Sequence, residues 1–298
     1  MKPARQSIDG VLLLNKPVGI TSNAALQKAK SLLNAKKAGH TGTLDPFADG
    51  LLPLCFGEAT KFSAYLLEAD KHYRAVMQLG VITTTGDPEG EVLSTREVNI
   101  SRDDILAVLP RFRGEIEQIP PMHSALKHQG RPLYEYARAG IEIERPARKV
   151  TIRALALLEC DLPRVVLDVQ CTAGTYIRTL AQDIGAALGC GAHLTALTRI
   201  AAGGFNLEQA HSLAALDALE AGQRQAWLQP ADCMVAHLPA LQLDEADTTA
   251  LCQGRSVSYT GVHSGLMRVY TTSNRFLGLA HADAGQLVPH RLIATQQA

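Results

Sequence analysis

The chain alternates between stretches whose apolar residues recur at regular spacing and short stretches rich in glycine, proline and charge. A continuous apolar run at 11–14 and an alternation of period two at 73–79 predict two strands. Apolar residues that return every three or four positions predict helices at about 22–38 and at 177–188. Strands and helices that follow one another in this way indicate an α+β domain.

Capping residues and glycines predict where several helices begin and end. Thr21 or Ser22 is expected to cap the first helix, and Gly39 is expected to end it. A further helix is predicted at 101–112, where a serine precedes two aspartates. The Ala-rich segment from about 211 to 228 is also expected to be helical.

The pattern changes beyond about residue 230. Short apolar runs, each broken by glycine and polar turns, predict an all-β module of about 60 residues. We therefore expect a large domain at 1–230 and a small one at 231–298. The longest polar connection within the large domain lies at about 120–150, and we treat it as an insertion.

Composition limits the class of protein. Hydrophobic residues make up 46% of the 298 residues and charged residues 19%, which favours a sizeable core over disorder. The formal net charge is zero, so a polyanion site requires local clusters of basic residues. The six cysteines lack C-x-x-C or metal-ligand spacing, which favours free thiols. Without a signal-like or membrane-spanning run, we expect a cytoplasmic protein that does not bind membranes.

The stretch Gly39–Pro46, GHTGTLDP, contains an unusually placed carboxylate. Asp45 is the first acidic residue after Asp9, and five lysines precede it in between. The following proline favours an extended or turn backbone at Asp45, and nearby lysines would favour its ionised form. Asp45 is thus either a nucleophile or base, or an ordinary turn residue.

Four other residues have both a functional and an ordinary reading. Arg178 falls in the first turn of a predicted helix, where the helix dipole disfavours a cation, so a carboxylate or phosphate partner is one explanation and solvent exposure the other. Tyr73 and Tyr176 either stack on a nucleobase or pack in the core. His40 in a glycine-rich loop is weak evidence for any role.

The connection at 120–153 has a basic bias. It holds seven basic residues, Lys127 and Arg131 among them, against three acidic ones. Such a segment is either an arm that grips phosphates or a solvated loop.

Five ordered blocks resemble the bacterial tRNA pseudouridine synthase B (TruB) family, and the end of the chain resembles a PUA-type RNA-binding module. The resemblance covers nearly the whole chain. The blocks are LLLNKPVGITS (12–22), GHTGTLDPFADGLLPLCFGEATK (39–61), KHYRA (71–75), PPMHSALKHQGRPLYEYARAG (120–140) and CTAGTYIRTLAQDIGAALGCGAHLTALTR (171–199).

The resemblance implies roles for individual residues. Asp45 matches the family's essential aspartate, Tyr73 the tyrosine that packs on the flipped uracil, and Arg178 the arginine paired with the aspartate. His40 matches the histidine that helps to displace the target base. Residues implied to line the uracil pocket or contact RNA are Tyr176, Leu197, Lys16, Lys127 and Arg131.

The resemblance also implies a fold and a reaction. The fold is a central mixed, largely antiparallel sheet flanked by helices, followed by a PUA-like domain. The reaction is isomerisation of uridine-55 to pseudouridine in the T-loop of tRNA by a monomer that needs no cofactor, guide RNA or protein partner. Whether the aspartate attacks C1′, adds to C6 or generates a glycal stays open.

Three other functions remain to be weighed. A non-catalytic RNA-binding protein would suit the basic connection and the tail. A glycoside hydrolase with an aspartate nucleophile would need a second carboxylate, for which Asp49 and Asp183 are the candidates. A guide-RNA-dependent pseudouridine synthase would keep the chemistry and change the partner.

Overall fold

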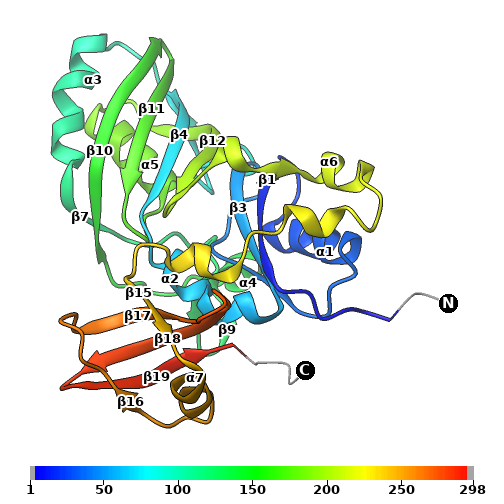
Figure 1. Cartoon of the computed structure of the whole chain (residues 1–298). Helices are drawn as coiled ribbons and strands as arrows, with labels where there is room; N and C mark the ends of the chain where they lie inside the picture. Colours follow the sequence, from blue (N-terminus) through cyan, green and yellow to red (C-terminus); the bar gives the residue numbers. More distant parts are fainter. Residues whose placement is uncertain (1–3, 294–298) are drawn as a thin grey trace.

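The computed structural model describes residues 4–293, and its centre is a 10-stranded mixed sheet (Figure 1). Neighbouring strands in it are antiparallel except for the pairs β1–β14 and β3–β12. This confirms the expected α+β fold with a mixed, largely antiparallel sheet. The strands, in spatial order, are β14 (His211–Ser212), β1 (Gly10–Lys16), β3 (Asp49–Phe56), β12 (Ala192–Ala202), β4 (Lys71–Leu79), β11 (Arg164–Cys171), β10 (Arg148–Asp161) and β7 (Gly114–Gln118), with β13 (Phe205–Asn206) beside β12 and β2 (Ala38–His40) beside β3.

Burial on one or both faces explains the two strand patterns. Leu12 and Leu14 of β1 join one apolar core, whereas Val11 and Leu13 join another on the opposite face, so the whole run is apolar. In β4 the alternate residues are buried and Arg74 between them is exposed, which gives the period of two. The first core is covered by α1 (Ser22–Leu32), α3 (Arg102–Val108), α5 (Ile177–Ala187) and α6 (Leu213–Ala218), and the second by the 3-10 helix η1 (Gly57–Phe62), α2 (Ser63–Leu67) and the 3-10 helix η5 (Ala231–Val235).

The polar connection has structure of its own. We call residues 119–147, between β7 and β10, the arm. It contains β8 (Lys127–His128), β9 (Arg131–Pro132) and α4 (Leu133–Arg138). The β8–β9 turn has positive φ at both central residues, Gln129 and Gly130, as a two-residue type I′ hairpin requires.

Two helix boundaries differ from expectation. The first helix ends at Leu32 rather than near Gly39, because Asn34 adopts the left-handed conformation (φ 51°) that terminates helices. The segment 211–228 is only partly helical: α6 ends at Ala218, and a separate 3-10 helix, η4 (Arg224–Trp227), follows. The Arg224 side chain donates hydrogen bonds to carbonyls near the end of α6 and so folds the chain back. The predicted helix at 101–112 is confirmed as α3 followed by the 3-10 helix η2 (Leu109–Phe112), with Ser101 as its cap.

The C-terminal module is a small β domain, as expected, and it carries one helix that the sequence pattern did not predict. The helix, α7 (Glu245–Cys252), is capped by the Asp244 carboxylate, which accepts from the Asp247 N–H at 2.8 Å. Only Leu251 of α7 is buried, which leaves little amphipathic signal in the sequence. The strands, in spatial order, are β15 (Ala240–Leu243), β17 (Gly265–Thr271), β18 (Phe276–Asp283), β19 (Gln286–Leu292) and β16 (Val257–Ser258).

The C-terminal module packs against the second face of the large sheet (Figure 1). Met234, Val235 and Leu279 share an apolar core with β1 and β3. Lys61 of η1 donates to the Leu292 carbonyl at 2.9 Å, and Arg291 donates to the Lys61 carbonyl at 3.2 Å. The proposed division at residue 230 stays a prediction. Within residues 4–293, no helix is both long and apolar enough to cross a membrane.

Candidate active site

Asp45 lies in the loop between β2 and β3, and its neighbours fix the loop from two sides. The buried Ser22 hydroxyl donates to the Leu44 carbonyl and accepts from the Leu44 N–H, at 3.0 and 2.8 Å. The Gly19 N–H donates to the Pro46 carbonyl at 2.7 Å. The residues on either side of Asp45 are therefore tied to the start of α1, so the carboxylate is presented by a rigid loop.

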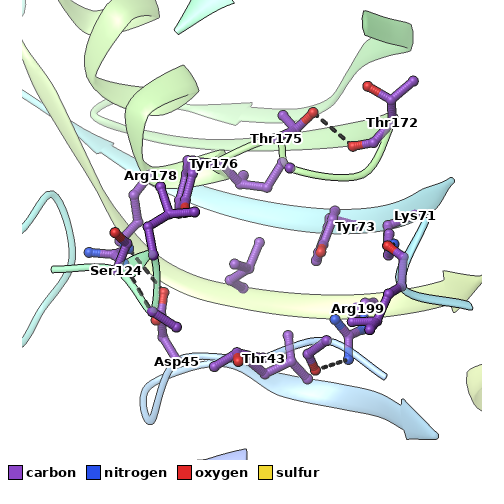
Figure 2. Close-up of a pocket in the computed structure, with 18 residues that line it drawn as sticks. Thr43, Asp45, Lys71, Tyr73, Ser124, Thr172, Thr175, Tyr176, Arg178 and Arg199 are labelled. Atoms are coloured by element: carbon purple, nitrogen blue, oxygen red, sulfur yellow. Dashed lines mark hydrogen bonds and ion pairs between the residues drawn. The ribbon is translucent and has the colours of Figure 1, made fainter. Parts of the chain in front are cut away.

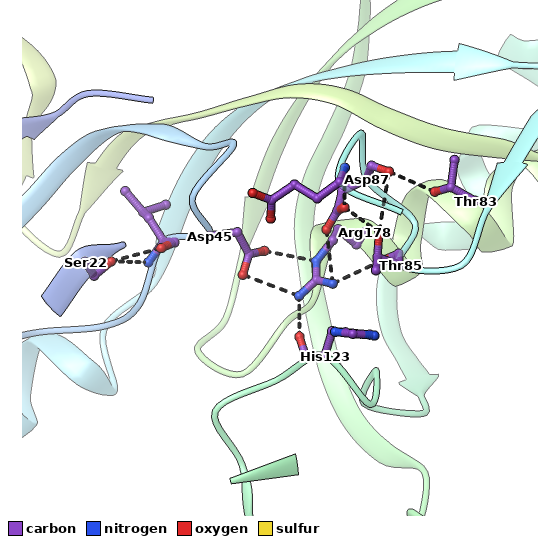
Figure 3. A network of polar contacts seen from close by, with 9 residues as sticks. Ser22, Asp45, Thr83, Thr85, Asp87, His123 and Arg178 are labelled. Atoms are coloured by element: carbon purple, nitrogen blue, oxygen red, sulfur yellow. Dashed lines mark hydrogen bonds and ion pairs between the residues drawn. The ribbon is translucent and has the colours of Figure 1, made fainter. Parts of the chain in front are cut away.

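Arg178 holds this carboxylate with two nitrogen atoms (Figure 3). Its Nε lies 2.9 Å from Asp45 Oδ2, and its Nη2 lies 3.4 Å from Asp45 Oδ1. The Arg178 side chain is 5% exposed and that of Asp45 is 32% exposed, so the carboxylate retains an open side. Of the two expected explanations for an arginine at this helix start, the carboxylate partner is confirmed.

A second carboxylate, which the sequence analysis did not single out, completes the network. Asp87 is buried, and its Oδ2 lies 3.3 Å from Arg178 Nη1. Arg178 also donates to the carbonyls of Thr85 at 3.1 Å and His123 at 2.6 Å. All three nitrogen atoms of the guanidinium thus lie against acceptor oxygens. The available signal was an Asp–Pro pair between glycines, the same pattern that drew attention to Asp45.

Burial has a larger effect than Arg178 on the pKa of Asp45. The sequence predicted that nearby lysines would favour the ionised form of Asp45. Removal from water instead raises its pKa above the usual value, and Asp87 adds to the increase, while Arg178 and Lys16 oppose it. Both cations therefore act in the expected direction, but the cost of burying the charge is larger.

A cavity of about 330 Å³ opens beside Asp45, large enough for a small planar ligand (Figure 2). Asp45 and Arg178 lie at one end, and Tyr73, Lys71 and Arg199 at the other. Among the predicted site residues, the structure brings together Asp45, Tyr73, Arg178, Tyr176 and Leu197 in the lining of this cavity.

Two buried cations at the far end were not predicted. The Arg199 side chain donates to the Leu51 carbonyl at 2.7 Å and the Gly42 carbonyl at 3.4 Å. The Lys71 ammonium donates to three carbonyls between residues 66 and 69, and burial lowers its pKa to about 8. Burial raises the pKa of Tyr73, and the cation of Arg199 opposes that increase.

The other predicted residues do not line the cavity. His40 lies on β2 with a buried, unpartnered Nδ1, and burial lowers its pKa. Lys16 is fully buried and donates to the Pro17 and Ile20 carbonyls. Lys127 and Arg131 are carried by the β8–β9 hairpin of the arm, where Arg131 pairs with Glu135 at 2.8 Å.

Neither candidate second carboxylate of a glycosidase faces the cavity. Asp183, on α5, borders a different hollow together with Ile82 and Arg96. Asp49 begins β3 and is also absent from the cavity lining. The lining of the cavity therefore combines a single carboxylate, its arginine and an aromatic wall, whereas a glycosidase places two carboxylates at the bond it cleaves.

Comparison with known sequences identifies the family. Residues 30–177 match the N-terminal domain of the TruB family pseudouridylate synthases, 178–236 the tRNA pseudouridylate synthase B C-terminal domain, and 239–293 the C-terminal domain of pseudouridine synthase II TruB. The chain is 74% identical to tRNA pseudouridine synthase B of Thiobacillus denitrificans over all of both chains. It is 58% identical to that of Chromobacterium violaceum, over 98% of this chain and 97% of the relative. The chain therefore belongs to the TruB family of tRNA pseudouridine synthases, which are isomerases that convert uridine to pseudouridine.

Solved structures share the fold. One is an H/ACA ribonucleoprotein bound to a substrate RNA that contains 2′-deoxyuridine, with a TM-score of 0.71 and 26% identity over 96% of this chain and 86% of that one. Another is a Cbf5–Nop10–Gar1 complex, with a TM-score of 0.70 and 29% identity over 97% of this chain and 84% of that one.

Proposed function

We propose that this protein converts uridine-55 in the T-loop of tRNA to pseudouridine, with Asp45 as the nucleophile. The observation that carries this proposal is the open carboxylate of Asp45, held by Arg178 at one end of an aromatic-lined cavity. The glycosidic N1–C1′ bond breaks, the uracil turns within the cavity, and a C5–C1′ bond forms. The proton on C5 leaves and N1 gains one, so no redox partner is needed.

The target base must leave the folded loop before it can reach Asp45. Extrusion of a stacked base costs roughly a few kcal/mol, which contacts to the opened loop must offset. We assign this work to His40, near the start of the Asp45 loop, and to the arm. The wall formed by Tyr73, Tyr176 and Leu197 then retains the uracil while its glycosidic bond is broken.

Tyr73 has two proposed tasks, contact with the uracil face and removal of the C5 proton. The phenol stays protonated near neutral pH because burial raises its pKa, so proton removal depends on the nearby Arg199 cation to favour the phenolate. Tyr73→Phe keeps the ring and removes the hydroxyl. It should retain tRNA binding but release little tritium from C5.

The relation to the ribonucleoprotein structures raises the question of a guide RNA. We propose that this chain acts alone, as a monomer in the cytoplasm, without a cofactor. Its relatives over the whole length are tRNA pseudouridine synthase B proteins. Purified protein should therefore modify a bare tRNA transcript. Activity only after addition of a guide RNA or a protein partner would contradict this part of the proposal.

The deciding experiment follows tritium release from a tRNA transcript labelled at uracil C5. The wild type should release the label from one uridine per tRNA, and a transcript with cytidine at position 55 should release none. Asp45→Asn should bind the transcript with little change and release no label. Release from the cytidine-55 transcript would overturn the site assignment in the RNA, and full activity of Asp45→Asn would overturn the nucleophile.

A further inference from the structure

Gln118 is a buried polar side chain outside the cavity lining. It is the last residue of β7 and only 1% exposed. Its carboxamide bonds twice to one residue across the site: Nε2 donates to the Tyr176 carbonyl at 3.2 Å, and Oε1 accepts from the Tyr176 N–H at 3.0 Å. Both hydrogen-bonding functions of the carboxamide are thus used on one residue that lies 58 positions away in the sequence.

Tyr176 is the N-cap residue of α5, and it cannot cap the helix with its own side chain. The Tyr176 carbonyl already accepts from the Leu180 N–H, the first bond of the helix. Gln118 bonds to both sides of the same residue and so fixes the start of α5. A helix start without a side-chain cap is a place where the first turn frays readily.

Arg178 lies in that first turn, two residues after Tyr176. Its two contacts with Asp45, at 2.9 and 3.4 Å, require the plane of the guanidinium to be aligned with the carboxylate. We propose that Gln118 is a positioning residue for the isomerisation, which holds the start of α5 so that Arg178 meets Asp45. This inference rests on the proposed role of Asp45.

The position of Gln118 also joins this alignment to the arm. Gln118 is the last residue before the arm, and it pairs with Arg148, the first residue after it. Within the arm, the His123 carbonyl accepts from Arg178 at 2.6 Å. Gln118, just before the arm, and His123, within it, are therefore both bonded to the start of α5, which carries Arg178. RNA contacts on the arm act on this helix start, and Gln118 holds it in place.

Gln118→Met tests the proposal because methionine has a similar shape and makes neither bond. Its tRNA affinity should stay within about threefold of the wild type. The rate of tritium release in a single turnover with saturating enzyme should fall roughly tenfold or more, since small misplacements of a reacting group are costly.

The pH profile separates positioning from loss of stability. Arg178 lowers the pKa of Asp45, so a loosened pair raises it, and the acid limb of the single-turnover rate should move to higher pH in Gln118→Met. A merely structural role would leave the acid limb where it is in the wild type. Thermal unfolding followed by circular dichroism shows whether each variant is folded at the assay temperature.

Arg113→Met is the matched control. Arg113 precedes β7 at its other end, and its guanidinium donates twice to the Leu155 carbonyl of β10, at 3.1 and 2.8 Å. It should lose stability but keep the wild-type single-turnover rate and acid limb. Equal rate losses in the two variants, or an unmoved acid limb in Gln118→Met, would overturn the proposal.

Two further variants keep the outcome decisive. If Gln118→Met does not fold, Gln118→Asn replaces it, because this side chain keeps the carboxamide but is one methylene too short to make both bonds. It should show the same direction of change in rate and acid limb, and an unmoved limb would count against the inference. Asp45→Ala tests the proposed function separately: if it is inactive while Gln118 variants behave like the control, only the positioning role fails.

Discussion

At the scale of residues, a buried guanidinium that contacts two carboxylates determines how Asp45 can act. Arg178 binds two carboxylates, so the cluster carries a net negative charge when both are ionised. Burial, with the charge of Asp87 added to it, is the reason that the arginine orients Asp45 without lowering its pKa overall. Orientation and charge are therefore separate contributions of the network, and different substitutions should alter them separately.

The raised pKa of Asp45 predicts a pH dependence. The nucleophile must be ionised, so the single-turnover rate should fall as the pH drops through a value above 3.8, the ordinary pKa of an aspartate. Arg178→Met removes a group that lowers this pKa, so the acid limb should move to higher pH and the rate should fall at least tenfold. Tritium release measured between pH 4.5 and 8 gives the limb. Arg164→Met, at an exposed pair with Glu159, should match the wild type.

Removal of Asp87 should move the acid limb of the single-turnover rate in the opposite direction to removal of Arg178. Its negative charge raises the pKa of Asp45, so Asp87→Asn should move the acid limb to lower pH. The rate at neutral pH should nevertheless fall roughly tenfold, because Arg178 loses an acceptor that fixes its second edge. The measurement is the same single-turnover profile. Asp168→Asn, which removes a carboxylate paired with His72, is the control. An acid limb that moves to higher pH in Asp87→Asn would refute this account.

At the scale of elements, periodicity located the strands and helices that carry the site. The alternation in β4 and the apolar face of α5 correctly placed Tyr73 and Arg178 on a strand and in a first helical turn. These patterns are visible in the sequence because each element buries one face. The ends of the helices were less predictable. Asn34 ends α1 by adopting a left-handed backbone. Glycine favours the same conformation, so a glycine further along the chain looked like an equally good end of the helix.

Local sequence patterns could not predict the contacts that complete the site. Asp87 and Arg178 are 91 positions apart, and the pairing of their elements decides that they meet. Arg199 lies on β12, whose parallel pairing with β3 brings it to the Gly42 carbonyl. The resemblance to a family supplied Asp45, Tyr73 and Arg178 together, whereas composition and spacing alone left each of them with an ordinary alternative.

The basic residues of the arm lead to a prediction about RNA affinity. Lys127 and Arg131 lie on its hairpin, and Arg131 is partly neutralised by Glu135. Lys127→Ala should therefore weaken tRNA binding more than Arg131→Ala does, and it should reduce the slope of log affinity against log salt by up to about one. Filter binding between 50 and 300 mM salt measures both. The single-turnover rate with saturating enzyme should stay unchanged, and an altered rate would show that Lys127 acts on the chemistry instead.

At the scale of the whole molecule, the sequence boundary near residue 230 crosses a shared core. The Gln229 N–H and carbonyl pair with Val11 of β1, and Met234 and Val235 just beyond pack on the same strand. The change of pattern in the sequence marks where short strands begin. It does not mark where contacts with the large sheet end, because η5 belongs to that sheet's second core.

Two truncations test this shared core. A chain ending at residue 230 loses Met234 and Val235 from the core that contains Val11, whereas one ending at residue 238 keeps both, and each truncation loses Leu279. Loss of large buried side chains costs about 2–5 kcal/mol each, so the shorter chain should unfold at a clearly lower temperature or aggregate. Thermal unfolding of both, beside the full chain, is the measurement. Equal stability of the two truncations would show that η5 contributes little, and that the large domain ends where the sequence pattern changes.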